Sequence, residues 1–207
     1  MANKTVDGNQ ITVVSHVNDL RISHENQDTV NALINKLSER YGKGVDLTIH
    51  RGKVHEYLGM KLDYRKEGKV KINITDYLKK ILNNLSSKYQ GRAITPAENL
   101  IFEVIKTMRK LSKKEAQAFH TIVAKLIFLC KQARPDILTG VAFLTTRVRE
   151  PDKDNYKKIS RILKYLSGTR DIILTLESDG TRRVKWWVDT EFTVHHDMKS
   201  HTGRMVY

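Results

Sequence analysis

Hydrophobic and polar positions follow a strand pattern near the start of the chain and then change to a helical spacing. Two short β-branched runs, residues 11–17 and 20–24, flank Asn18-Asp19, a composition typical of a tight hairpin turn. The ten residues before them are polar, contain Asp7 and show no strand pattern. Beyond the hairpin an apolar stripe at three- and four-residue intervals ends at Gly42, which predicts an amphipathic helix lying against a sheet. Its members are Val30, Leu33, Ile34, Leu37 and Tyr41.

A second group of strands and a short helix are predicted before residue 86. Residues 45–50 are predicted as a strand, and residues 54–64 and 69–74 as a hairpin around Glu67-Gly68. Thr75 is the predicted N-cap of the helix that follows. The apolar stripe of this helix is Tyr77, Leu78, Ile81, Leu82 and Leu85. Residues 86–110 contain Gly91 and Pro96 and few periodic apolar positions, so we interpret them as a linker.

Three helices are predicted between residues 111 and 170. Ser112 and Glu115 have the spacing of a capping box, and the apolar helix that follows ends near Pro135. A second helix follows, and a third begins at Pro151-Asp152 and ends at Gly168. The apolar stripes are Phe119, Ile122, Val123, Leu126, Leu129 and Cys130 in the first, Ile137, Val141 and Leu144 in the second, and Tyr156, Ile159, Ile162, Leu163 and Leu166 in the third.

The C-terminal residues return to a strand pattern. Residues 172–176 and 184–188 are predicted strands, separated by a turn at residues 178–180, and Asp189 ends the second strand. His195, His196 and His201 follow, but no carboxylate or thiolate pattern accompanies them, which argues against a transition-metal site. Trp186 and Trp187 divide between core and surface by alternation, and the outward one could stack on a base.

Composition narrows the class of protein. The 207 residues are 40% hydrophobic and 29% charged, as in a soluble globular protein, and no apolar run reaches the roughly 20 residues of a membrane span. The first residues lack the apolar core of a signal peptide, so we expect an intracellular protein, cytoplasmic or nuclear. Cys130 is the single cysteine, which excludes a disulfide within the chain and favours a packing role.

The net charge of +14 is unevenly distributed along the chain. Residues 1–50 hold five Lys or Arg against six Asp or Glu, a balance of −1, whereas residues 104–170 hold sixteen against five, a balance of +11. Such a concentration on helices favours the nucleic-acid backbone as a partner, the alternative being a solvated basic face. On the third helix Lys157, Lys158, Arg161 and Lys164 lie opposite the apolar stripe and are the predicted contacts.

Several motifs, in order, resemble the Pol polyprotein of copia-type LTR retrotransposons. They are the hairpin His16-Val17-Asn18-Asp19, the box Tyr57-Leu58-Gly59-Met60, Thr95-Pro96-Ala97, the run from Phe119 to Leu126, Ala133-Arg134-Pro135-Asp136-Ile137, Leu163-Lys164-Tyr165-Leu166-Ser167-Gly168-Thr169, and the stretch from Val184 to Asp189 with Met198 to Gly203. The resemblance covers the chain from about residue 11 to its end. It implies a reverse transcriptase palm, thumb and connection leading into the start of an RNase H domain.

The resemblance also implies metal-binding positions. The palm hairpin of this family presents two adjacent acidic residues, and here Asn18 stands at the first and Asp19 at the second. Asp189 matches the first metal-binding residue of the RNase H domain. Two-metal catalysis requires carboxylates that hold a pair of Mg²⁺ ions, and an Asn supplies only a neutral oxygen. Asp19 is therefore a remnant of a magnesium site or only a turn residue, and Mg²⁺ binding is implied by the family rather than by the residues.

We therefore expect an α+β fold: a partial palm with an antiparallel sheet and helices, a basic helical thumb and connection, and a truncated RNase H-like hairpin. The expected domains are residues 1–85, the linker 86–110, the helical part 111–170 and the RNase H-like start 171–207. The expected function is that of a fragment of an RNA-directed DNA polymerase, impaired by itself, with an RNA–DNA primer–template as partner. A non-catalytic nucleic-acid-binding protein and a subunit completed by another chain are the alternatives. Arg134 is predicted to pair with Asp136, a structural role, or with a phosphate.

Overall fold

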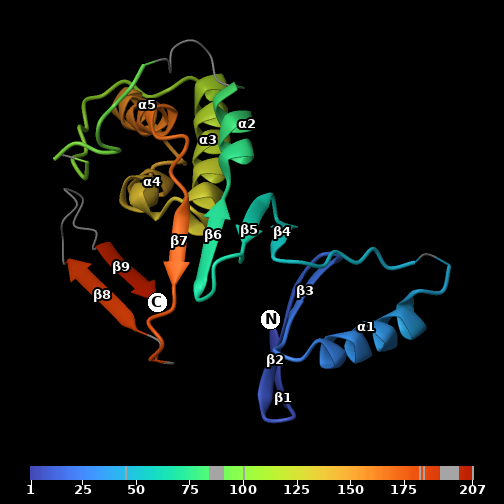
Figure 1. Cartoon of the computed structure of the whole chain (residues 1–207). Coiled ribbons are helices and arrows are strands. Elements are labelled where there is room, and N and C mark those ends of the chain that lie inside the picture. The colour runs from blue at the N-terminus through green and yellow to red at the C-terminus, as the bar shows by residue number, and fades with distance from the viewer. Residues whose placement is uncertain are drawn as a thin grey trace. The chain divides into compact units, whose positions relative to one another are not determined.

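The computed structural model describes residues 1–44, 46–83, 91–99, 101–181, 183, 185–191 and 201–206, and the side chains of 186, 187, 189–191 and 201–206 lie outside that description. The chain forms two compact units, unit 1 (Met1–Gly52) and unit 2 (Lys53–Tyr207). Antiparallel sheets and helices make up both, so the predicted α+β class is confirmed (Figure 1). The predicted domain boundaries and the assignment of palm, thumb and RNase H parts stay predictions.

Unit 1 contains a three-stranded antiparallel sheet in the order β1-β2-β3. Its strands are β1 (Ala2–Val6), β2 (Asn9–His16) and β3 (Asp19–Ser23), so the hairpin predicted around residue 18 is present. The prediction of no strand in the first ten residues is wrong, because β1 pairs with β2 along its whole length. The turn between them is Asp7-Gly8, with φ angles of 50° and 80°, a dipeptide that strongly favours hairpins.

Helix α1 (Gln27–Tyr41) ends at the predicted glycine, Gly42. The Asn26 side chain accepts a hydrogen bond from the backbone N–H of Asp28 at its start, and the Gly42 N–H donates to Ser38 O over 2.7 Å at its end. No residue of α1 is fully buried, but Val30, Leu33, Ile34 and Leu37 of its apolar stripe are half-buried, so the packing of this stripe against a sheet stays a prediction. The strand predicted at residues 45–50 is wrong, because residues 46–50 form no strand.

Unit 2 contains a four-stranded antiparallel sheet, β4-β5-β6-β7. The strands are β4 (Val54–Tyr57), β5 (Met60–Asp63), β6 (Lys69–Asn73) and β7 (Leu174–Glu177). The single strand predicted over residues 54–64 is therefore two strands joined by a tight turn at Leu58-Gly59, where φ is 51° and 72°. Strands β8 (Trp186–Glu191) and β9 (His201–Val206) form a separate two-stranded sheet.

The helices of unit 2 are α2 (Thr75–Asn83), α3 (Lys113–Gln132), the short 3₁₀ helix η2 (Pro135–Ile137), α4 (Leu138–Thr145) and α5 (Lys153–Gly168). The capping box of Ser112 and Glu115 is confirmed. Asp152 forms a second capping box with Asn155 at the start of α5. Thr75 is not an N-cap, because it is already helical and its N–H donates to Asn73 Oδ1 over 2.8 Å.

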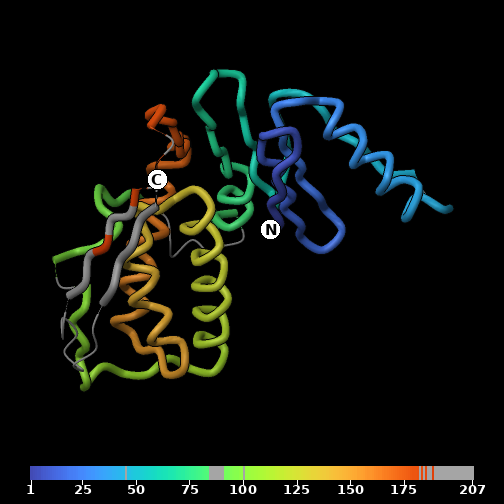
Figure 2. Tube along the Cα trace, turned by 90° about the horizontal axis from the view of Figure 1, so that it is seen from below, coloured from blue at the N-terminus to red at the C-terminus, as the bar shows by residue number. Residues whose placement is uncertain are grey.

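The core of unit 2 lies between its sheet and its helices. Helix α4 contacts both α3 and α5, and α2 contacts the same two helices (Figures 1 and 2). All six predicted apolar positions of α3 are buried, and so is Met60 of β5 on the sheet side. Part of the predicted linker also packs here: Ile101 is buried and the Phe102 ring meets Phe143 edge-on at 5.9 Å. In the described part of the chain no helix has the length and apolar character needed to cross a membrane.

Candidate nucleic-acid interface

The hairpin β2–β3 places Asn18 and Asp19 at an exposed end of the unit 1 sheet. His16 pairs with Asp19, so the two turn residues are Val17 and Asn18 rather than Asn18 and Asp19. Val17 is 92% exposed and has a φ of 53°, a left-handed value that a β-branched residue adopts at a cost. Asp19 is the first residue of β3, and its carboxylate faces solvent.

The carboxylates around Asp19 do not make a two-metal site. Asp7 lies in the turn at the other end of β2, about 25 Å away at the usual rise of an extended strand. Among the described residues no three His, Cys, Asp or Glu side chains gather where they could hold a metal. One carboxylate beside a neutral amide does not fit the charged oxygen set that a pair of Mg²⁺ ions requires. The metal role predicted for Asp19 therefore stays a prediction that would need ligands from outside the described residues.

Asp189 lies within strand β8, opposite Gly203 of β9, rather than at the end of a strand as predicted. Its side chain lies outside the described ones, so its predicted role as an RNase H-type metal ligand stays a prediction. His195 and His196 lie outside the described residues. His201 pairs with Glu191 in the β8–β9 ladder.

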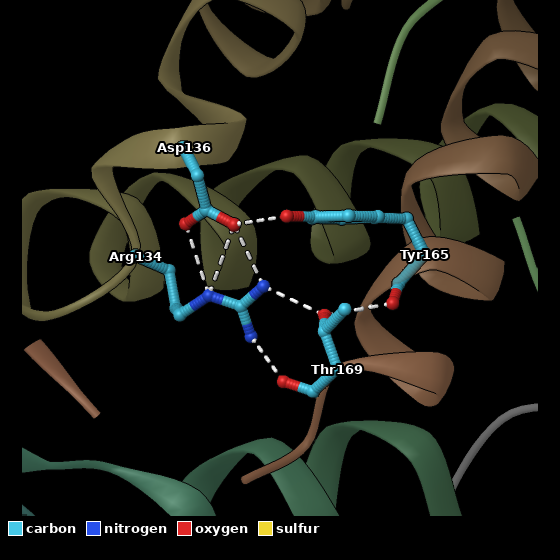
Figure 3. A network of polar contacts seen from close by, with 4 residues as sticks. All are labelled: Arg134, Asp136, Tyr165 and Thr169. Carbon is cyan, nitrogen blue, oxygen red and sulfur yellow. Dashed lines mark hydrogen bonds and ion pairs between the residues drawn. The ribbon is translucent and has the colours of Figure 1, made fainter. Parts of the chain in front are cut away.

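Arg134 joins the start of η2 to the end of α5 (Figure 3). Its side chain is 1% exposed, and it donates from Nε and Nη2 to both oxygens of Asp136. Nη1 donates to the Thr169 carbonyl over 2.9 Å and Nη2 to the Thr169 hydroxyl over 2.8 Å. The Tyr165 hydroxyl donates to Asp136 Oδ2 over 2.8 Å. Every guanidinium nitrogen thus has a partner within the fold and the side chain is buried, which confirms the structural role.

The ionisation of this network follows from its contacts. Burial acts to raise the pKa of Asp136, but hydrogen bonds from Arg134 and Tyr165 outweigh it and hold the pKa below its ordinary value. Burial and the bond to Asp136 raise the pKa of Tyr165. The network is therefore an ion pair with a neutral phenol at neutral pH.

The cations predicted on α5 differ in what they contact. Lys158 has a side chain only 13% exposed, pairs with Asp154 at 2.8 Å and donates to the carbonyl of Glu103 over 2.5 Å. Arg161 pairs with Glu98 at 2.6 Å. Their predicted nucleic-acid contacts stay predictions, in competition with these internal partners.

Lys157 and Lys164 differ from those two residues. Lys157 is exposed, and Lys164 is half-buried with its aliphatic carbons beside Gly91. The described part of unit 2 gives neither of them an ion-pair partner. They are the members of the predicted set best placed to reach a ligand.

A second basic cluster was not predicted from the sequence. Lys113 and Arg149 are exposed, without an ion pair in the described structure, and line a groove of about 490 Å³. Gln117, His120, Ala116 and Val148 complete its lining. The available signal was the pair of short runs Lys113-Lys114-Glu115 and Arg147-Val148-Arg149-Glu150, each with more cations than acids. Their proximity could not be read from sequence, because the runs lie more than thirty positions apart.

Comparison with known proteins identifies relatives along nearly the whole chain. A transposon Ty5-1 protein of Saccharomyces cerevisiae is 27% identical over 204 residues, 98% of this chain and 63% of that protein. An uncharacterized mitochondrial protein of Arabidopsis thaliana is 25% identical over 86% of this chain and 70% of its own length. The retrovirus-related Pol polyprotein from transposon TNT 1-94 of Nicotiana tabacum is 24% identical over 79% of this chain, which spans 12% of that polyprotein.

No family model and no solved structure matches the chain. Two of these three relatives are nevertheless named as transposon proteins, in agreement with the motifs between residues 16 and 203. The resemblance predicted from the sequence is confirmed, and the chain is a relative of the copia-type retrotransposon Pol proteins.

Proposed function

We propose that this chain is the nucleic-acid-binding portion of a retrotransposon reverse transcriptase, and that unit 2 holds the sugar–phosphate backbone of an RNA–DNA primer–template. The observation that carries the proposal is the balance of +11 in residues 104–170 together with exposed cations that have no ion pair in the described part of the chain. These cations include Lys106, Arg109, Lys113, Lys114, Lys131, Arg149 and Lys157. Contacts from such side chains to phosphates position a duplex and carry no base sequence.

The binding mode follows from the type of side chain and from the rigidity of the helices that carry it. Helices α3 and α5 are anchored by buried stripes and by capping boxes, so their exposed cations are held on fixed backbones. Lysine and arginine neutralise phosphates by displacing condensed counterions, which makes affinity fall as salt rises. We therefore expect binding that is insensitive to sequence and strongly sensitive to salt.

Catalysis by the chain alone is not part of the proposal. The reverse transcriptase resemblance implies a polymerase step on Mg²⁺, and bound Mg²⁺ would there stabilise the attacking and leaving oxygens of nucleotide transfer. Asp19 beside the neutral Asn18 supplies only one carboxylate, which does not fit the charged oxygen ligands that a pair of Mg²⁺ ions requires. The proposal is therefore of binding without polymerase activity, and the same holds for RNase H activity at Asp189.

A second candidate function is that of a subunit completed by another chain. Helix α1 has an apolar stripe that is only partly covered, and among the described residues β1 and β3 are the open edges of the unit 1 sheet. Open edges and uncovered apolar stripes are the features that pair with other chains. In this alternative a fuller reverse transcriptase would supply the missing carboxylates.

The test is fluorescence anisotropy of a labelled primer–template with the purified chain, in Mg²⁺ or in a chelator, with nucleotides present so that extension is read in the same tube. We expect equal binding in both conditions and no extension. Extension that disappears in Asp19→Ala would contradict the proposal of a non-polymerising binder. Absence of binding would refute nucleic-acid recognition itself, and extension only after a longer reverse transcriptase is added would favour the second candidate.

A further inference from the structure

The groove beside the first turns of α3 has two walls from distant parts of the sequence. Lys113, Gln117 and His120 are spaced by four and three residues, so they share one face of α3. The second wall is the segment between α4 and α5, which contributes Val148 and Arg149. The groove has a volume of about 490 Å³ and is largely open to solvent.

The groove is positively charged because its neighbouring acids are already paired elsewhere. Glu115 accepts from Lys153 Nζ over 2.8 Å and from the Ser112 N–H and hydroxyl over 2.9 Å. Glu150 lies 3.7 Å from Lys110 Nζ. Each acid near the groove thus has its own cation, so the charges of the two groove cations are left for a ligand.

The two walls are fixed to each other before any ligand binds. The Leu111 N–H donates to the Pro151 carbonyl over 2.9 Å, and the Lys153 N–H donates to the Arg109 carbonyl over 3.0 Å. Lys110 and Asp152 form a β-bridge in the same place. Such preorganisation lowers the entropic cost of binding.

We propose that this groove binds one phosphodiester unit of a nucleic-acid backbone, an inference that rests on the proposed function and names its contact point. Arg149 can donate two parallel hydrogen bonds to a phosphate, and Lys113 supplies a compact second charge. Gln117 and His120 offer hydrogen-bonding groups to the sugar or the second phosphate oxygen. Val148 and Ala116 supply the apolar surface against which a sugar ring packs.

The experiment measures duplex binding across a salt series for three forms of the full chain. The test variant carries Lys113→Gln and Arg149→Gln. The control carries Lys61→Gln and Lys80→Gln, the same loss of charge at exposed residues of β5 and α2, outside residues 104–170. The far-ultraviolet circular dichroism of both variants should equal that of the wild type, because none of the four lost cations makes a described ion pair.

We expect the magnitude of the slope of log association constant against log salt to fall by about one in the test variant, because its two lost cations hold a single phosphate, and to stay unchanged in the control. Protection of Lys113 from amine-reactive labelling by bound duplex should accompany the change. Equal slopes in the wild type and the test variant, or an equal decrease in slope in the test variant and the control, would refute phosphate binding by the groove while leaving the proposed function intact. No binding by the wild type would refute both.

A nucleoside monophosphate is the competing source of the same phosphate chemistry. We expect millimolar monophosphate to leave Lys113 labelling unchanged, since one isolated phosphate lacks the neighbouring contacts of a backbone. Protection of Lys113 by the monophosphate equal to that by the duplex would identify a free-nucleotide site and overturn the backbone assignment.

Discussion

Removing the Arg134 side chain is expected to destabilise unit 2 because it leaves Asp136 without its partner. Loss of one partner from a fully buried ion pair costs about 3–5 kcal/mol. The Asp136 side chain is 32% exposed and can be rehydrated in part, so we expect Arg134→Ala to lower the free energy of unfolding by about 3 kcal/mol, the lower end of that range. Arg134→Lys keeps the charge but cannot reach Asp136 and the Thr169 carbonyl together, and should cost about 1–2 kcal/mol.

The assay is urea unfolding followed by far-ultraviolet circular dichroism. With a denaturant slope of about 2 kcal/mol/M, the Arg134→Ala midpoint should fall by about 1.5 M. Arg65→Ala is the matched control, because Arg65 makes the same kind of paired contact with a residue two positions away, Asp63, at 2.6 Å, but is 74% exposed. Exposed pairs contribute little, so this midpoint should not move. Equal midpoints for the two variants would refute the assignment of Arg134 as a buried structural link.

Three further predictions concern single groups. The pKa of Glu115 is lowered to about 2, first by its hydrogen bond with Lys153 and then by those with Ser112. A carboxyl whose pKa is lower in the folded state stabilises the fold at pH values above its unfolded pKa of 4.5, and this contribution is lost as the pH falls toward 2. The urea midpoint of the wild type should therefore fall between pH 4.5 and 2 more steeply than that of Glu115→Gln, and parallel curves would contradict this. Val17→Gly should relieve the strained φ of 53° and slow amide hydrogen exchange in β2 and β3 by several-fold, the stabilisation being about 1 kcal/mol; faster exchange would contradict it. Burial raises the pKa of the Cys130 thiol to about 11, so its reaction with a disulfide reagent at pH 8 should be slow in the native protein and fast in denaturant, and a fast native reaction would show that the helical core opens readily.

The helical core could be predicted because its signals are local. The stripe from Phe119 to Cys130 recurs at helical spacing and is buried as expected. The capping box at Ser112 needs only a residue three positions ahead, Glu115, to be recognised. The strand predictions failed at two hairpin turns, Asp7-Gly8 and Leu58-Gly59, in which both residues have positive φ.

The candidate site was harder to predict because its determinants are distant in sequence. Lys158 and Arg161 sit on the polar face of α5 as expected, yet their partners Glu103 and Glu98 are 55 and 63 residues away. The groove of Lys113 and Arg149 likewise depends on two segments that the fold brings together. Helical periodicity shows which face is polar, but it does not show which cations on that face are already paired.

The most direct test of the proposed function is the salt dependence of primer–template binding by the wild-type chain. Each neutralised phosphate contributes about 0.9 to the slope of log association constant against log salt for B-form DNA. Four of the cations without a described ion pair, Lys113, Arg149, Lys157 and Lys164, neutralise three phosphates when Lys113 and Arg149 share one. They should therefore give a slope of about −3 or steeper, the same for unrelated duplex sequences. Absence of binding, or binding that salt does not weaken, would contradict recognition of the nucleic-acid backbone by unit 2.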